Sequence, residues 1–154
     1  MPSHDFTIFA DYFQFYIQDE RADADLSKAW SDEAVARLLA VAPGVVGIGT
    51  VRNLDVPVSI EFFSKEPIAS LAQWDHVVEC SLSVQCGRIV VAGCTDYFPD
   101  AARIDAAPGT YRVRVCFAGL HSLSPDGLDG DDRYRLELWQ APAIEATVLN
   151  QRAV

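Results

Sequence analysis

Basic residues are scarce in this chain of 154 residues: Lys and Arg number 12 against 22 Asp and Glu, and the net charge is −10. Binding to a phosphate backbone needs clustered Lys and Arg, so the charge argues against nucleic acid as a direct partner and against an anionic membrane surface. A basic protein is the partner that this charge favours, because opposite fields speed association. An acidic surface also serves solubility alone, and composition does not separate the two explanations.

Long apolar runs are absent as well. No window approaches the ~18 consecutive apolar residues of a transmembrane helix. The first eleven residues lack the basic and then apolar pattern of a signal peptide, because Asp5 and Asp11 interrupt them. We therefore expect a cytoplasmic protein with one domain spanning residues 1–154. A chain of this length buries roughly 70% of its unfolded surface, so it needs neither a metal nor a disulfide to fold.

The four cysteines carry no metal-binding pattern. Cys80, Cys86, Cys94 and Cys116 form no Cys-x-x-Cys pair, whereas zinc ligands usually come in close pairs. Cys80 and Cys116 lie inside strand patterns and are expected to be small core residues. A reducing cytoplasm disfavours a disulfide. We expect no cofactor.

Catalytic motifs are also missing from the sequence. It has no Gly-rich phosphate loop, no Gly-x-Ser-x-Gly elbow and no His-Glu-x-x-His. His76 follows Asp75, but neighbours on a strand point to opposite faces and would not form an acid–base pair. The Asp-rich stretch 126–132 departs from the ligand spacing of a calcium loop. The sequence therefore assigns no catalytic and no metal-binding residue, and favours a protein that is not an enzyme.

The pattern that is present is β. Apolar and polar residues alternate with period two in a succession of short segments. Their spacing predicts an all-β fold, mainly an antiparallel, jelly-roll-like β-sandwich, and a lone helix cannot supply the crossovers of a parallel sheet. The expected strands lie within 6–18, 45–52, 57–63, 77–84, 88–92, 111–117, 134–139 and 146–149.

One short helix is expected near residues 31–41. Ser31 is a good N-cap, because its hydroxyl accepts an otherwise unpaired backbone N–H, and acidic residues follow in the first turn. Trp30 and Val35 have the spacing of a hydrophobic staple. Pro43 and Gly44 are expected to end the helix.

Two acidic segments are candidates for contact with a partner. Either segment can mimic phosphates and occupy a basic groove, although acidic loops also serve solubility. The candidate partner-binding residues are Asp19, Glu20, Asp23 and Asp25 in the first segment, and Asp126, Asp129, Asp131 and Asp132 in the second.

Several short motifs, taken in their order and spacing, resemble the DNA-entry nuclease inhibitor family, the competence protein J type of naturally transformable bacteria. The resemblance is strongest over residues 6–63. The motifs are Tyr12-Phe13-Gln14-Phe15, Trp30-Ser31-Asp32-Glu33-Ala34, Arg52-Asn53 and, later in the chain, Gly109-Thr110-Tyr111.

This resemblance implies a small β protein that binds a nuclease and blocks it. Related small β proteins also look like immunity proteins, which neutralise a toxin made by the same cell. The expected function is thus a non-enzymatic inhibitor or immunity-type protein whose partner is a basic nuclease or toxin.

Two other functions stay open at this level. A β-sandwich that binds a small molecule or carbohydrate would gather aromatic rings around a cleft. Its pocket residues would be Tyr12, Gln14, Tyr16, Arg52, Trp74 and Trp139. A metal-assisted hydrolase would instead use the second acidic segment and a histidine. An exposed sheet edge is also compatible with a homodimer.

Overall fold

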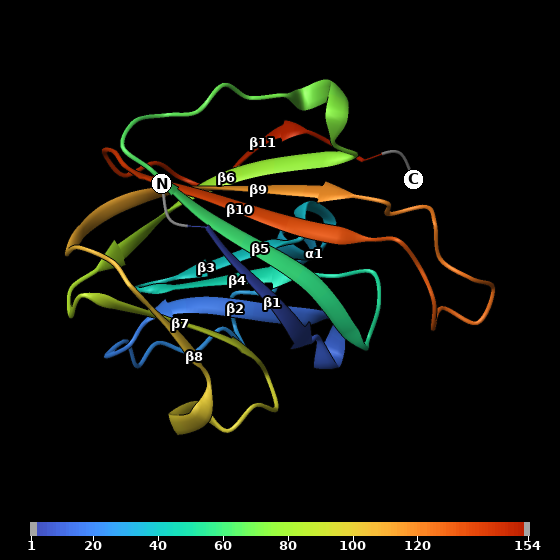
Figure 1. Ribbon diagram of the computed structural model, residues 1–154, viewed down its shortest axis with the longest axis horizontal. Coiled ribbons are helices and arrows are strands. Elements are labelled where there is room, and N and C mark those ends of the chain that lie inside the picture. Colours follow the sequence, from blue (N-terminus) through green and yellow to red (C-terminus); the bar gives the residue numbers. More distant parts are fainter. Residues whose placement is uncertain (1–2, 153–154) are drawn as a thin grey trace.

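A computed structural model describes residues 3–152 as two β-sheets packed face to face (Figure 1). Sheet A has the strand order β1-β5-β10-β9-β6-β11, and sheet B has the order β3-β4-β2-β7-β8. The pairs are antiparallel except for β5 with β10, which are parallel. The predicted all-β sandwich with one short helix is confirmed. The strands are β1 (Ser3–Phe9), β2 (Gln14–Asp19), β3 (Leu39–Ala42), β4 (Val45–Gly49), β5 (Asp55–Phe63), β6 (His76–Val84), β7 (Arg88–Gly93), β8 (Ala102–Asp105), β9 (Gly109–Ala118), β10 (Arg133–Gln140) and β11 (Thr147–Asn150).

The period-two alternation places the core between the sheets. On β9, Val113 and Val115 are fully buried in this core, and on β10 Leu136 is buried opposite them. The residues between them, such as Arg114 and Glu137, point to the outer face of sheet A and form ion pairs there. The alternation along each strand therefore determines which side chains face the core and which face the outer surfaces of the sandwich.

The first β segment, expected as one run over residues 6–18, is two strands in different sheets. β1 pairs with β5 in sheet A, whereas β2 lies between β4 and β7 in sheet B. A short 3-10 turn at Asp11–Phe13 separates them, and Tyr12 and Phe13 there have left-handed φ values of 61° and 59°. Neither Gly nor Pro marks this turn, so the alternating pattern runs through it without a signal.

The helix is shorter than predicted. α1 spans Asp32–Arg37, and the Ser31 hydroxyl accepts from the Ala34 amide at 3.2 Å, which confirms the N-cap. Leu38 ends the helix with a left-handed φ of 59°, and the chain continues as β3. Pro43 and Gly44 therefore lie between β3 and β4 rather than at the end of the helix.

Val35, the expected partner of Trp30 in a hydrophobic staple, is 55% exposed. The Trp30 indole instead packs over Gly47 of sheet B, and its N–H donates to Gln14 Oε1 at 2.9 Å. The segment just before the helix is therefore attached to sheet B by a hydrogen bond between side chains 16 residues apart in sequence.

The cysteines are all free thiols in the described part of the chain. Cys80 and Cys116 are buried as predicted, and burial raises the pKa of each thiol to about 12. Within residues 3–152, no helix has the length and apolar character needed to cross a bilayer.

His76, at the start of β6, is buried and held in its neutral form. Its Nε2 lies 2.7 Å from the Arg37 carbonyl oxygen, and the Arg152 amide donates to its Nδ1 at 3.1 Å. The two contacts together fix the tautomer with the proton on Nε2. Burial lowers the pKa of His76, because the charged ring would be desolvated.

This burial predicts a loss of stability on mild acidification. The folded-state pKa of His76 is below the ~6.5 of the unfolded chain, so its contribution is complete above pH ~6.5 and is lost as the pH falls through the folded pKa. Urea unfolding between pH ~8 and ~5 measures the effect. His76→Gln keeps one donor and one acceptor without titrating, and we expect its free energy of unfolding to fall less over this range. Equal falls in both proteins would contradict the assignment.

Candidate functional site: the loop end of the sandwich

Three connections meet at one end of the sandwich, on the right in Figure 1: residues 10–13, 50–54 and 119–132. We call this region the loop end. The Ala10 amide donates to the Leu54 carbonyl at 2.9 Å, and the Thr50 amide donates to the Phe13 carbonyl at the same distance. The first two connections therefore support each other through backbone bonds.

A buried polar cluster ties the third connection to the other two. Arg52 Nε donates to Asp132 Oδ1 at 2.6 Å, and the Tyr134 hydroxyl donates to Asp132 Oδ2 at 2.7 Å. The same hydroxyl accepts from the Val51 amide at 3.0 Å. The Asp132 side chain is fully buried and that of Arg52 is 13% exposed. Burial and the bond to Asp132 raise the pKa of Tyr134, so its proton stays in place as a donor.

The outer part of the 119–132 loop is ordered by its own side chains. Asp126 Oδ1 accepts from the Ser124 hydroxyl at 2.5 Å and from the Leu128 amide at 3.0 Å, and these bonds lower the pKa of Asp126. Serine hydroxyls also accept from the amides of Asp129 (3.0 Å) and Asp131 (2.7 Å). The carboxylates of this turn are therefore exposed on a loop that is held by its own hydrogen bonds.

The predicted acids of this second segment therefore separate into two groups. Asp126, Asp129 and Asp131 are exposed, whereas Asp132 is 1% exposed and already bound to Arg52 and Tyr134. Asp132 braces the loop and is not part of its acidic surface. Residues 3–152 contain no group of three or more His, Cys, Asp or Glu side chains placed to hold a metal ion.

The first acidic segment lies at the opposite end, where β2 finishes. Asp19 is buried and its carboxylate accepts from the Cys86 amide at 3.1 Å, so this acid also faces inward. Glu20 is paired with Arg103 at 2.8 Å. Asp23 and Asp25 remain exposed. The two acidic segments thus do not form one continuous surface.

The predicted pocket residues are dispersed rather than gathered. Tyr12 and Arg52 belong to the loop end, where the former is exposed and the latter is paired with Asp132. Gln14 and Tyr16 line a shallow groove on the outer face of sheet B, and burial, together with Cys94 and Asp96, raises the pKa of Tyr16.

The two tryptophans of that predicted set lie on sheet A or beside it. Trp139 is buried beneath Arg114, whose guanidinium lies 4.9 Å from the ring centroid. Trp74 packs against Arg133 at 4.8 Å. Because the rings occupy separate places, no aromatic cleft of the kind that the carbohydrate-binding alternative requires is formed by this set.

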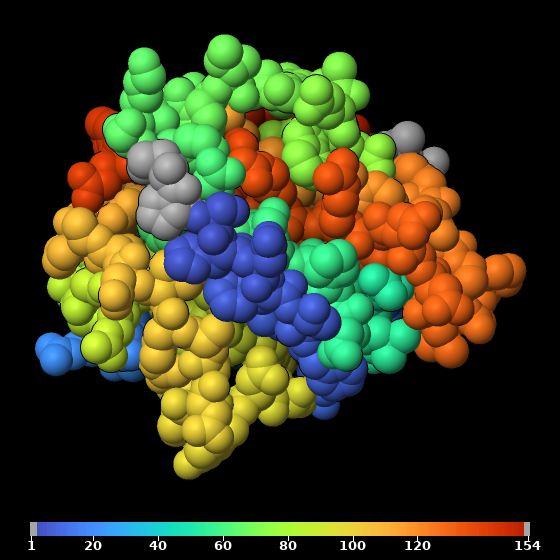
Figure 2. Space-filling model, in the orientation of Figure 1, coloured from blue at the N-terminus to red at the C-terminus, as the bar shows by residue number. Residues whose placement is uncertain are grey.

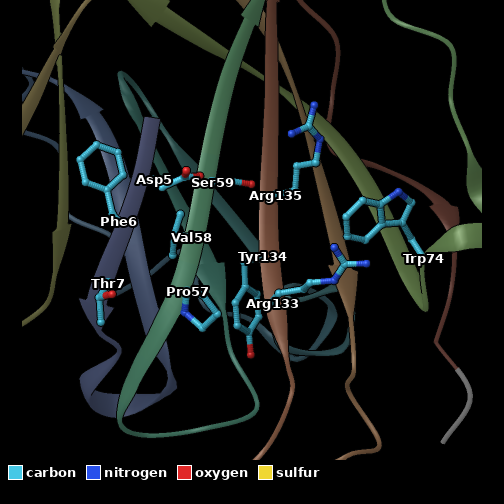
Figure 3. A pocket seen from close by; sticks show the side chains of 10 residues that line it. All are labelled: Asp5, Phe6, Thr7, Pro57, Val58, Ser59, Trp74, Arg133, Tyr134 and Arg135. Atoms are coloured by element: carbon cyan, nitrogen blue, oxygen red, sulfur yellow. The ribbon is translucent and has the colours of Figure 1, made fainter. Parts of the chain in front are cut away.

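A groove of about 490 Å³ runs across the outer face of sheet A (Figure 3). In the figure Asp5 and Ser59 lie on one side and Trp74 on the other, with Arg133 and Arg135 between them. Arg135 is already paired with Glu61 at 2.9 Å and with Glu137 at 3.2 Å. The charge of Arg135 in this groove is therefore already offset by two carboxylates.

The sequence has no matching family model and no matching curated protein. Solved structures do match the fold. The crystal structure of ComJ, inhibitor of the DNA degrading activity of NucA, from Bacillus subtilis, superimposes with a TM-score of 0.67 and covers 92% of this chain and 96% of ComJ, at 18% identity. The chain has the fold of ComJ.

A second structure, described as crocagin biosynthetic gene J, gives a TM-score of 0.62 at 17% identity and covers 92% of this chain and all of that one. The resemblance inferred from the motifs between residues 6 and 63 is thus confirmed as a likeness of fold. It extends well beyond those residues, because ComJ matches nearly the whole chain.

The motifs that carried the resemblance have mostly structural roles. Arg52 braces the loop end, and Ser31 caps α1. Asn53 Oδ1 accepts from the Phe13 amide at 3.4 Å, which links two of the motifs in space. The role of Asp132 could not be found from the sequence, since its partner Arg52 lies 80 positions away. No local pattern around Arg52 or in the acidic loop indicates that these two segments are in contact in the fold.

Proposed function

We propose that this protein is a non-enzymatic inhibitor that binds a basic nuclease and blocks it with the acidic surface of its loop end. The observation that carries the proposal is the fold shared with ComJ over nearly the full length of both chains, ComJ being an inhibitor of a DNA-degrading activity. The net charge of −10 supports a basic partner, as nucleases that hold a phosphate backbone require clustered cations.

The loop end suits this role better than the other acidic segment does. Asp126, Asp129 and Asp131 are exposed and lie on a loop braced from below by Asp132. In the first segment Glu20 is already neutralised by Arg103. A loop that is ordered before binding loses less conformational entropy on association, so its carboxylates contribute more to affinity.

Inhibition would then require no chemical step by this protein. Carboxylates spaced along a turn take the place of phosphates in the cationic groove of the nuclease and exclude the DNA. Such binding is fast at low salt and weakens as salt screens the charges. A nuclease toxin of the same cell fits this description as well as a secreted nuclease does, and both share the basic groove.

Capture from the source organism's own lysate tests this proposal. Immobilised protein is loaded at low salt and eluted with rising salt, and each eluate is assayed for degradation of DNA. We expect one basic nuclease to elute with salt and to regain activity once separated. A resin that retains no DNA-degrading activity at low salt would count against the proposal.

A further inference from the structure

The exposed aromatic side chains are not spread over the surface. In the described part of the chain, the exposed Phe, Tyr and Trp residues are Phe9 (39%), Tyr12 (70%), Phe13 (52%) and Tyr97 (70%). Single exposed apolar residues are ordinary, but large rings gathered on one surface mark an interaction site. All four rings lie on two turns, residues 9–13 and 94–100, which we call the twin turns.

The twin turns carry the same tripeptide. Asp11-Tyr12-Phe13 lies in the first, and Asp96-Tyr97-Phe98 lies in the second. Each tripeptide forms or adjoins a 3-10 turn, and the two tyrosines are equally exposed. Each turn therefore carries an exposed tyrosine next to an aspartate.

The two turns are neighbours in the fold. They leave paired strands at the same end, since Phe15 of β2 is opposite Gly93 of β7. A Cβ on Gly93 would meet the Phe9 carbonyl oxygen at 2.1 Å, so the two segments are in backbone contact. In Figure 2 the dark-blue end of the first turn and the yellow 94–100 segment border each other.

Chain length keeps the two tyrosines within one footprint. Tyr12 is three residues from Phe15 and Tyr97 is four from Gly93, so the Cα atoms of the tyrosines are at most ~30 Å apart. A partner that buries ~800 Å² of this protein would span both. Because residues 10–13 also belong to the loop end, the twin turns extend its surface.

The charged residues within the twin turns are all acidic. Asp11, Asp96 and Asp100 lie within the twin turns, which contain no Lys, Arg or His. Arg103, outside the twin turns, lies 5.1 Å from the centroid of the Phe98 ring and is paired with Glu20. Within residues 3–152, no Arg or Lys is stacked on the other rings of the twin turns. Tyr12 and Tyr97 are each 70% exposed, so most of either side chain is open to a partner.

We infer that the twin turns are a docking surface for a cationic segment of a protein partner, with Tyr12 and Tyr97 as its main contacts. Arg side chains stack on aromatic faces and pair with adjacent carboxylates, and Tyr is enriched among residues that dominate interface energies. A second copy of this chain would instead bring carboxylates against carboxylates. The identification of the partner as a nuclease rests on the proposed function. The inference that the twin turns bind a cationic segment does not depend on it.

The test uses Tyr12→Ser with Tyr97→Ser in the full chain. Its matched control is Val35→Ser with Ile68→Ser, which removes two exposed apolar side chains elsewhere. The first readout is the affinity for the nuclease captured on the resin, where we expect the double tyrosine variant to bind at least ~10-fold more weakly and the control to match the wild type. Unchanged affinity of the tyrosine variant would overturn the inference while leaving the inhibitor function intact.

The second readout needs no nuclease. A peptide that alternates arginine and leucine is titrated into isotope-labelled protein, and amide shifts are followed by NMR. We expect the largest changes in residues 11–13 and 94–97, lost in the tyrosine variant and smaller with an arginine–serine peptide. Shifts centred on residues 122–131, or equal shifts in both proteins, would overturn the inference. The inference would also be overturned if the protein formed a dimer at high concentration and the tyrosine substitutions abolished it. The twin turns would then bind a second copy of this chain.

Discussion

Replacing Asp132 by Ala is expected to lower the free energy of unfolding by about 3 kcal/mol, because it breaks a buried ion pair from one side. Arg52, whose side chain is 13% exposed, would lose its carboxylate partner, and the Tyr134 hydroxyl would lose its acceptor. An uncompensated buried charge is the costly part of such a change. Urea unfolding of the variant and the wild type measures the loss.

The neighbouring residue supplies the control. Asp131 is exposed and its side chain carries no ion pair in the described structure, so Asp131→Ala is expected to stay within ~0.5 kcal/mol of the wild type. Adding Arg52→Ala to Asp132→Ala should cost less than the sum of the single changes, since the two residues are coupled. If Asp132→Ala were as mild as Asp131→Ala, the buried cluster would not be what holds the loop end together.

Neutralising Asp126, Asp129 and Asp131 to Asn is expected to slow association with the captured nuclease at least ~10-fold at low salt. The acids would steer the partner before contact, and Asn keeps a side-chain oxygen to accept the loop's own hydrogen bonds. The difference between variant and wild type should shrink at high salt, since screening removes the steering in both. Stopped-flow binding at two salt concentrations measures both effects.

A control with the same change in net charge separates local from global effects. Asp23→Asn, Asp25→Asn and Glu145→Gln also remove three exposed acids, away from the loop end. We expect this variant to keep the association rate within ~2-fold of the wild type. Equal slowing in both triple variants would mean that only the total charge matters and that the loop end is not the contact surface.

Much of the fold could be predicted because alternation is a local signal. The inward set on β9 and β10 follows directly from the sequence, and so does the Ser31 cap. The division of residues 6–18 into strands of two sheets could not be predicted. Tyr12 and Phe13 turn the chain in a left-handed conformation that is usually adopted by Gly.

The site was predicted less well, since burial depends on contacts across the fold. Composition identifies an acidic loop, but it does not separate the exposed Asp131 from the buried Asp132 next to it. That difference arises from Arg52, which approaches from another connection. The recurring Asp-Tyr-Phe tripeptide is visible in the sequence, yet its meaning depends on the pairing of β2 with β7, which brings the two copies together.

The most direct test of inhibition is a titration of the captured, purified nuclease with this protein, followed by the rate of DNA cleavage. We expect cleavage to fall in proportion to the added protein and to stop near an equimolar ratio, while the protein alone neither binds nor cleaves the DNA. Continued cleavage at a large molar excess, at low salt and with the folded protein, would contradict it.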